Sequence, residues 1–446
     1  MLRRALELLE ERAASGSPLG LALVGAGAFG TMLLAQARRL AGLEVAGVAD
    51  LAPARARAAL ERAGWPSDGR PPVTDDPAEL IARDGVDVVV EATGDAVAGV
   101  GHALEAIRSG RHVVMVNVEA DALAGPALAA RARAAGAVYS LAYGDQPALV
   151  CELVDWARAS GFEPVCAGKG TKHLPAYPSV TPDDVWPHYG LTPEQVAAGG
   201  FSARMFTSFL DGTKSAIEMA AVCNAAGLVP QEEGLRFPPA GARQLAGICI
   251  PREDGGRLSR RGTVEVVSSL EPDGTPVPDD LRFGVYVTFE APSGYVAGCF
   301  AAYGLATDAS GRYAALWRPY HLVGLETTVS VLAAGLLGEA TGAPDALRAD
   351  AVALAKRDLR AGETLDGEGG FTVAGALVPV SRSLGDGLLP IGLARGAVLR
   401  NPIRAGEPVR RDDVEPLAET EALALRRELE SAAVSPPSTR RDSTSR

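Results

Sequence analysis

Lysine is scarce in this chain. Only four of its 43 basic residues are lysines, and three of these lie between positions 169 and 214, whereas arginine serves almost everywhere else. Aromatic residues make up only 5% of the 446 residues. The five cysteines are odd in number, widely spaced and without a C-x-x-C pair, which argues against a disulfide framework or a zinc site. We therefore expect reduced thiols in a cytoplasmic protein.

Long apolar runs and a positive net charge are also missing. No apolar run approaches the 18 residues that a membrane-spanning helix needs, and the amphipathic start of the chain is too charged for a signal peptide. The net charge of −12 argues against nucleic acid or an anionic membrane as a partner. Any anionic ligand must then be held by a local positive pocket. We expect a small-molecule substrate and a homo-oligomer.

The first third of the chain alternates short apolar runs with helical patterns, which predicts an α/β fold with a doubly wound parallel sheet. The expected strands are 21–24, 43–48, 86–92, 112–116 and 137–140, and the expected helices are 29–40, 53–63, 96–109 and 124–135. Together they form a Rossmann dinucleotide-binding domain over residues 1–145.

From about residue 145 the pattern changes to that of an α+β central domain, which we place at 146–345. A helix begins after Asp145, a second runs over 213–226 and ends at Gly227, and a long apolar helix near 322–337 closes the domain. Two-residue alternation at 264–267 and 283–289 predicts an antiparallel sheet.

The remaining chain divides into two parts. Residues 346–418 are rich in glycine and short strands and contain an echo, Asp358-Leu-Arg-Ala-Gly-Glu and Pro402-Ile-Arg-Ala-Gly-Glu, which indicates a small β-rich module. We expect residues 419–446 to be a disordered tail, since Ser, Pro and Arg dominate its end.

A glycine-rich motif near the start of the chain indicates where a dinucleotide would bind. Gly25-Ala-Gly27-Ala28-Phe29-Gly30 follows a strand and opens a helix, and Asp50 ends the next strand. These glycines permit a tight turn, close approach of a pyrophosphate, and close helix–strand packing. Asp50 would accept hydrogen bonds from a ribose 2′-OH and so favours NAD, whereas Arg55 and Arg57 on the following helix could reverse that preference.

The segment Glu91-Ala-Thr93-Gly94-Asp95 follows a third strand and has two interpretations. Its acids either lie beside the nicotinamide ribose or cap the helix that begins near Ala96. Thr93 and Gly94 are assigned to the cofactor site.

Lys214 stands out among the four lysines. Asp211, Lys214 and Glu218 are three and four residues apart, so they would share one helix face. A surface ion-pair ladder is the simpler interpretation, but a cation in the first turn opposes the helix dipole. Lysine, unlike arginine, has a pKa that can fall by several units on burial. We therefore expect Lys214 to donate or accept a proton in the reaction.

Linked motifs in this sequence resemble those of the homoserine dehydrogenase-like superfamily. More closely, the chain is similar to the branch of 1-deoxy-D-xylulose-5-phosphate reductoisomerase-like (DRL) oxidoreductases. The glycine motif takes part in the resemblance, with Met115-Val-Asn117-Val-Glu-Ala-Asp, Tyr143-Gly-Asp-Gln-Pro-Ala, Gly168-Lys-Gly-Thr-Lys and Phe209-Leu-Asp-Gly-Thr-Lys-Ser-Ala. The C-terminal module resembles a SAF domain, a β-clip fold, and the resemblance implies a GAPDH-like central domain.

The resemblance implies an NADPH- or NAD-dependent oxidoreductase, and at least one family member also isomerises its sugar phosphate. We expect reduction of a small anionic hydroxy or keto substrate, with Asn117 added to the cofactor site. Alternatives are a plain dehydrogenase of an amino-acid semialdehyde or branched sugar acid, and a non-catalytic dinucleotide-sensing protein. The expected catalytic residues are Lys214, Asp211, Glu218 and Lys172, and the expected substrate-binding residues are Lys169, Arg204, His173 and Asp145.

An isomerising enzyme would also need a second proton carrier. Asp145, Glu152 and Glu119 are candidates for that role or for divalent metal ligands, and each would serve equally as a helix cap. A requirement for metal is left open by the sequence.

Overall fold

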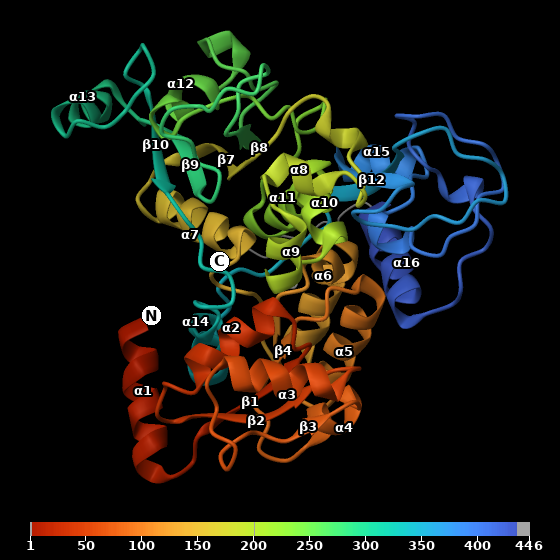
Figure 1. The fold of residues 1–446 in the computed structure, drawn as a ribbon. Coiled ribbons are helices and arrows are strands. Elements are labelled where there is room, and N and C mark those ends of the chain that lie inside the picture. Colours follow the sequence, from red (N-terminus) through yellow and green to blue (C-terminus); the bar gives the residue numbers. More distant parts are fainter. Residues whose placement is uncertain (1, 200, 435–446) are drawn as a thin grey trace, which may run out of the picture.

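A computed structural model describes residues 2–199 and 201–434 (Figure 1). Residues 435–446 of the expected tail lie outside this range. The chain folds into a lower α/β part at the N-terminal end, an upper mixed-sheet part and a C-terminal module at the side (Figure 1). No helix in the described ranges is long and apolar enough to cross a membrane.

The N-terminal part is the expected Rossmann fold. Its six strands are parallel, in the order β3-β2-β1-β4-β5-β6. The strands are β1 (Leu19–Val24), β2 (Leu43–Ala49), β3 (Val73–Thr74), β4 (Val88–Glu91), β5 (His112–Met115) and β6 (Tyr139–Leu141). The helices are α1 (Leu2–Ser15), α2 (Ala28–Ala37), α3 (Pro53–Arg62), α4 (Pro77–Ala82), α5 (Ala96–Arg108) and α6 (Val118–Ala134).

Helix α6 begins six residues before its predicted start at 124. The Asn117 side chain caps it by accepting from the Ala120 N–H at 3.1 Å. Pro126 lies inside this helix. Proline usually marks the first turn of a helix, which explains why the sequence pattern placed the start too late.

The central part holds a four-stranded sheet in the order β10-β9-β7-β8. Its strands are β7 (Glu163–Thr171), β8 (Thr263–Ser268), β9 (Val285–Glu290) and β10 (Tyr313–Arg318). The sheet is mixed rather than antiparallel, since β7 and β8 run parallel. Strand β7 escaped prediction because it contains two glycines, which strand patterns disfavour. They allow close approach, since a Cβ at Gly168 would lie 1.8 Å from the Glu265 carbonyl oxygen.

Several helices surround this sheet, and two were predicted at their observed positions. Helix α7 (Gln146–Ala159) follows its cap Asp145, and α11 (Thr213–Ala226) ends at Gly227 in the left-handed conformation, φ +69°. The other elements of this part are the short helices η1 (Tyr177–Ser179), α8 (Val185–Tyr189), α9 (Pro193–Gly199), α10 (Ala203–Leu210), η2 (Ala242–Gln244), α12 (Leu245–Ile248), η3 (Arg252–Asp254) and α13 (Gly294–Ala302).

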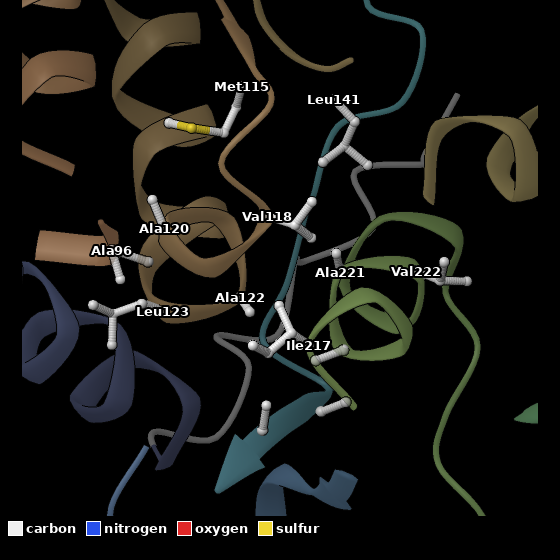
Figure 2. Close-up of a cluster of buried hydrophobic side chains, with 14 of the residues drawn as sticks. Ala96, Met115, Val118, Ala120, Ala122, Leu123, Leu141, Ile217, Ala221 and Val222 are labelled. Carbon is white, nitrogen blue, oxygen red and sulfur yellow. The ribbon is translucent and has the colours of Figure 1, made fainter. Parts of the chain in front are cut away.

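Helix α11 lies at the centre of the molecule, in contact with α6, α7 and the C-terminal module. Figure 2 shows Val118 and Ala122 of α6 turned toward Ile217 and Ala221 of α11. The side chains at this crossing are small or branched and buried, so the two helices approach closely. This packing holds α11, the helix that carries Lys214, against α6 of the Rossmann part.

The apolar segment at 322–337 packs against the Rossmann sheet rather than closing the central domain. It forms α14 (Thr328–Leu332) and a π-helical turn, η4 (Ala333–Leu337), which contact α1 and β5. A Cβ at Gly335 would lie 2.6 Å from the Leu19 side chain, so the segment rests directly on β1.

The C-terminal module pairs β11 (Ala349–Ala355) with β12 (Val373–Pro379) in antiparallel fashion. It also contains α15 (Val380–Gly385), η5 (Ile391–Leu393) and η6 (Arg411–Asp413). The two echoed segments pair with each other, because Leu359 and Ile403 exchange backbone hydrogen bonds of 2.8 and 3.1 Å. The internal repeat is therefore a structural pair within this β-rich module.

The prediction of disorder from residue 419 is wrong as far as Val434. Residues Glu421–Val434 form helix α16, which packs on α5 and α6, with Leu423, Leu425 and Arg426 buried. Only the composition after Val434 is rich in Ser and Pro, so the tail prediction began too early.

Candidate active site

One pocket of about 1090 Å³ lies where the three parts of the chain meet. Gly27 and Thr93 line it from the Rossmann part, Lys214 and Lys169 from the central part, and Glu368 from the C-terminal module. The expected cofactor and substrate residues thus largely face one cavity.

The glycine motif has the geometry of a phosphate-binding turn. Gly25 has φ +100°, and a Cβ there would lie 2.6 Å from the Ala92 carbonyl oxygen. At Gly30 a Cβ would lie 2.5 Å from the Gly25 carbonyl oxygen, whereas at Gly27 it would meet nothing within 4 Å. No side chain caps the start of α2, where Ala28 and Phe29 line the pocket. The free N–H groups of this helix fit a pyrophosphate.

Asp50 is buried and engaged on both carboxylate oxygens. It accepts from the Ala26 N–H at 2.9 Å and from Arg55, whose Nε and Nη2 lie 3.0 and 2.8 Å away. Burial raises its pKa, but the backbone hydrogen bonds and Arg55 outweigh burial and lower the pKa overall. Arg55 therefore neutralises the carboxylate that was expected to repel a 2′-phosphate.

Asp95 caps α5 through the Ala98 N–H at 2.9 Å, as one interpretation expected; it also lines the pocket, and its contact with the nicotinamide ribose stays a prediction. Glu91 is buried and accepts from the Thr93 hydroxyl at 2.5 Å. Asn117, which lines the pocket with Thr93 and Gly94, donates to the Asp95 carbonyl at 2.9 Å. These hydrogen bonds connect residues 91–95 with one another and with Asn117 at the wall of the pocket.

The acids expected to steer Lys214 pair with other lysines. Glu218 forms a buried ion pair with Lys169, and Asp211 forms one with Lys356 at 2.7 Å. The helix face assumed from the sequence is broken by Gly212, whose φ of +90° ends α10 before α11 begins. Asp211 consequently has a structural role here.

Lys356 ties the C-terminal module to the central part. Its side chain is 2% exposed and also donates to the carbonyls of Val180 and Gly370, both at 2.8 Å. The ammonium group thus has two hydrogen bonds and one ion pair. This role could not be inferred from the sequence, since Lys356 is far from the other lysines along the chain.

Lys214 pairs instead with Glu119 in the first turn of α6, at 2.5 Å. Burial alone would lower the pKa of Lys214, but the charges of Glu119, Glu368, Glu218 and Asp145 outweigh it and raise the pKa well above its usual value. The expected fall in pKa is therefore wrong. Lys214 is a stable ammonium group in the pocket, suited to donating hydrogen bonds and stabilising negative charge.

Asp145 and Glu152 differ in their surroundings. Asp145 lines the pocket and caps α7, and burial together with Glu218 raises its pKa to about 6 against the opposing effects of Lys214 and His321. Glu152 instead accepts from the Tyr143 hydroxyl at 2.8 Å, outside the pocket lining. Within the described ranges, no group of three or more His, Cys, Asp or Glu side chains is arranged to hold a metal ion.

Three of the four residues expected to contact the substrate have other partners in the structure, although Lys169 and Arg204 do line the pocket. Lys169 donates to Gln146 at 2.9 Å as well as to Glu218, so it has little capacity for an anion. Arg204 donates to backbone carbonyls of the C-terminal module, including that of Glu368 at 3.0 Å. His173 lies outside the pocket lining, stacked on Phe237 at 4.1 Å, and burial lowers its pKa to about 4.

Two other cations remain at the pocket wall. Lys172 and Arg282 both lie near the Tyr189 ring, 5.7 and 5.8 Å from its centre. Burial and then the charge of Arg282 lower the pKa of Lys172. Among the described residues, neither group has a carboxylate within ion-pair distance, although Lys172 donates to the His188 carbonyl. Two neighbouring cations without a carboxylate are suited to holding an anion, and nothing in the local sequence had marked Arg282 as a pocket residue.

Three family models match consecutive parts of the chain. They are the homoserine dehydrogenase NAD-binding domain over residues 21–141, the catalytic domain of oxidoreductase DRL over 144–327, and the SAF domain over 350–415. The chain carries the catalytic domain of a DRL-type oxidoreductase. Its cofactor is NAD or NADP, and the suspected family and fold class are confirmed.

Solved structures similar to this DRL-type chain align with about a third of it. An NAD-binding oxidoreductase from Klebsiella pneumoniae is 23% identical, with 37% of this chain and 45% of that chain covered and a TM-score of 0.29. Myo-inositol dehydrogenase from Lactobacillus casei is 16% identical, with 35% and 47% covered and a TM-score of 0.27. Less than half of either protein's own length is spanned. No curated protein matches the sequence.

Proposed function

We propose that this DRL-type enzyme reduces the carbonyl group of a small anionic substrate, a phosphorylated sugar or a sugar acid, with NAD(P)H. The observation that supports this best is the single pocket. It joins an uncapped glycine-rich turn, a stable ammonium at Lys214, and a pair of cations, Lys172 and Arg282, that lack a carboxylate partner.

Residues in different parts of the pocket have different roles in this reaction. Bound NAD(P)H supplies a hydride. Lys214 donates a hydrogen bond to the substrate carbonyl oxygen and stabilises the charge that develops there. Lys172 and Arg282 hold the anionic group, with the guanidinium able to form a bidentate contact.

Isomerisation before reduction would use a second group that titrates near neutral pH. Asp145 suits this role, since its pKa is raised to about 6 and it lines the same pocket. Turnover of a ¹³C-labelled sugar phosphate, followed by analysis of the carbon skeleton, separates a reductoisomerase from a plain dehydrogenase.

The proposed reaction is tested by screening phosphorylated and carboxylated keto compounds for NAD(P)H oxidation. With the best substrate, Arg282→Gln should raise KM by ~10-fold or more and change kcat little, because the lost contact is a charge-assisted hydrogen bond to a non-reacting group. Arg243→Gln, an exposed site away from the pocket, is the control. Tight NAD(P)H binding without turnover of any compound would instead favour a dinucleotide sensor.

On this proposal cofactor choice depends on Arg55, which is bonded to the carboxylate of Asp50, the residue expected next to the ribose 2′ group. Arg55→Ala should weaken NADPH binding by ~10-fold or more and affect NADH binding little, since only NADPH carries that phosphate. Fluorescence titration measures both dissociation constants, and Arg39→Ala, an exposed arginine just after the end of α2, serves as the control. Equal losses for both cofactors would show that Arg55 does not contact the phosphate.

A further inference from the structure

The SAF domain presents a short loop, residues 366–371, to the active-site pocket. Gly367 and Gly369 flank Glu368 with φ of +77° and +60°, conformations that other residues rarely adopt. A Cβ at Gly369 would lie 1.9 Å from the Arg204 carbonyl oxygen. The loop is therefore pressed against α10 and tolerates only glycine at this contact.

Both ends of the loop are anchored. The Asp366 carboxylate accepts from the Phe371 N–H at 2.7 Å and from the Thr372 N–H at 3.1 Å. Arg204 donates to the carbonyls of Asp366 and Glu368. These bonds hold the backbone on either side of Glu368, whose side chain lines the pocket together with Lys214 and Glu119.

Glu368 differs from the other glutamates of the pocket wall. Glu119 and Glu218 each form an ion pair with a lysine, whereas Glu368 has no cation within ion-pair distance among the described residues. Burial and the charge of Glu119 raise its pKa, Lys214 and Ser208 act in the opposite direction, and Asp211 adds to the rise. The resulting pKa is about 8, so this carboxyl group carries a proton at neutral pH.

We propose that Glu368, contributed by the SAF domain, is the proton donor to the substrate oxygen in the reduction. This inference rests on the proposed function. As hydride adds to the carbonyl carbon and the nicotinamide is oxidised, the π electron pair moves to oxygen. The Glu368 O–H bond breaks and its proton forms the new hydroxyl, leaving a carboxylate that solvent reprotonates.

Lys214 and Glu368 then have different roles in the reaction. Lys214, whose high pKa disfavours proton release, stabilises the developing alkoxide, and Glu368 supplies the proton. The pocket is then catalytically complete only when the SAF domain is docked on α10 and α11. The bond from the Gly375 N–H to the Thr213 hydroxyl, 2.7 Å, is one of the contacts that hold it there.

The test compares Glu368→Gln with wild type and with Glu407→Gln, an exposed glutamate of the same module. We expect kcat to fall ~10²-fold in Glu368→Gln only. In the wild type, kcat/KM should fall above about pH 8, because the donor must be protonated, and this limb should vanish in the variant. An unchanged kcat and pH profile would overturn the inference.

A measurement without turnover separates this inference from the proposed function. Potentiometric titration of wild type and Glu368→Gln between pH 6 and 9 should show one fewer titrating proton, centred near pH 8, in the variant. Identical curves would overturn the assignment of Glu368. Absence of wild-type turnover on every keto compound would overturn the proposed reaction, whereas wild-type turnover with a fully active Glu368→Gln would overturn the role of Glu368 alone.

Discussion

Lys214→Met should lower kcat by ~10²- to 10³-fold, the loss typical of removing one group that stabilises a developing oxyanion. The substitution also leaves Glu119 without its partner at 2.5 Å, and a partly buried carboxylate that loses its cation destabilises the fold. Steady-state kinetics measures the first effect, and denaturant unfolding measures the second.

A double variant separates catalysis from folding. Lys214→Met with Glu119→Gln removes both charges of the pair, so it should recover stability while kcat stays low. Lys214→Arg keeps the positive charge and should retain more activity than Lys214→Met, since a stable cation is what the pocket uses here. Near-wild-type kcat in Lys214→Met would show that another group stabilises the substrate oxygen.

The largest effect on stability is expected at Arg426, on the C-terminal helix α16. Its side chain is fully buried, pairs with Asp350 of β11 at 2.5 Å and donates to the Leu123 carbonyl of α6 at 3.2 Å. Arg426→Met leaves Asp350 buried without a cation, which should lower the free energy of unfolding by ~3–5 kcal/mol. Denaturant unfolding followed by circular dichroism checks this.

A neighbouring arginine supplies the matched control. Arg427 pairs with Glu419 at 2.8 Å on the surface, with 53% of its side chain exposed, so Arg427→Met should cost less than ~1 kcal/mol. Arg426→Met with Asp350→Asn should regain part of the lost stability. If Arg426→Met were as mild as Arg427→Met, the buried ion pair of Arg426 with Asp350 would not contribute to the stability of the fold.

Local signals in the sequence determined much of the fold. Gly227 ends α11 and Asp145 begins α7 where predicted, because helix ends depend on residues within one turn of them. The glycine motif likewise predicted its turn, since a Cβ at Gly25 or at Gly30 would clash with nearby backbone and Gly27 leaves open space for a ligand. The family motifs carry the same kind of local information, and they identified all three domains.

Only the tertiary structure decided which charges meet. Asp211 and Glu218 are adjacent to Lys214 in the sequence, yet Lys214 pairs with Glu119, 95 residues away. The sign of its pKa shift also comes from distant segments, because burial and nearby carboxylates act in opposite directions and the sequence does not show which prevails. Glu368 reaches the pocket for the same reason: its place depends on how the SAF domain docks, and that packing is set by contacts far apart in the chain.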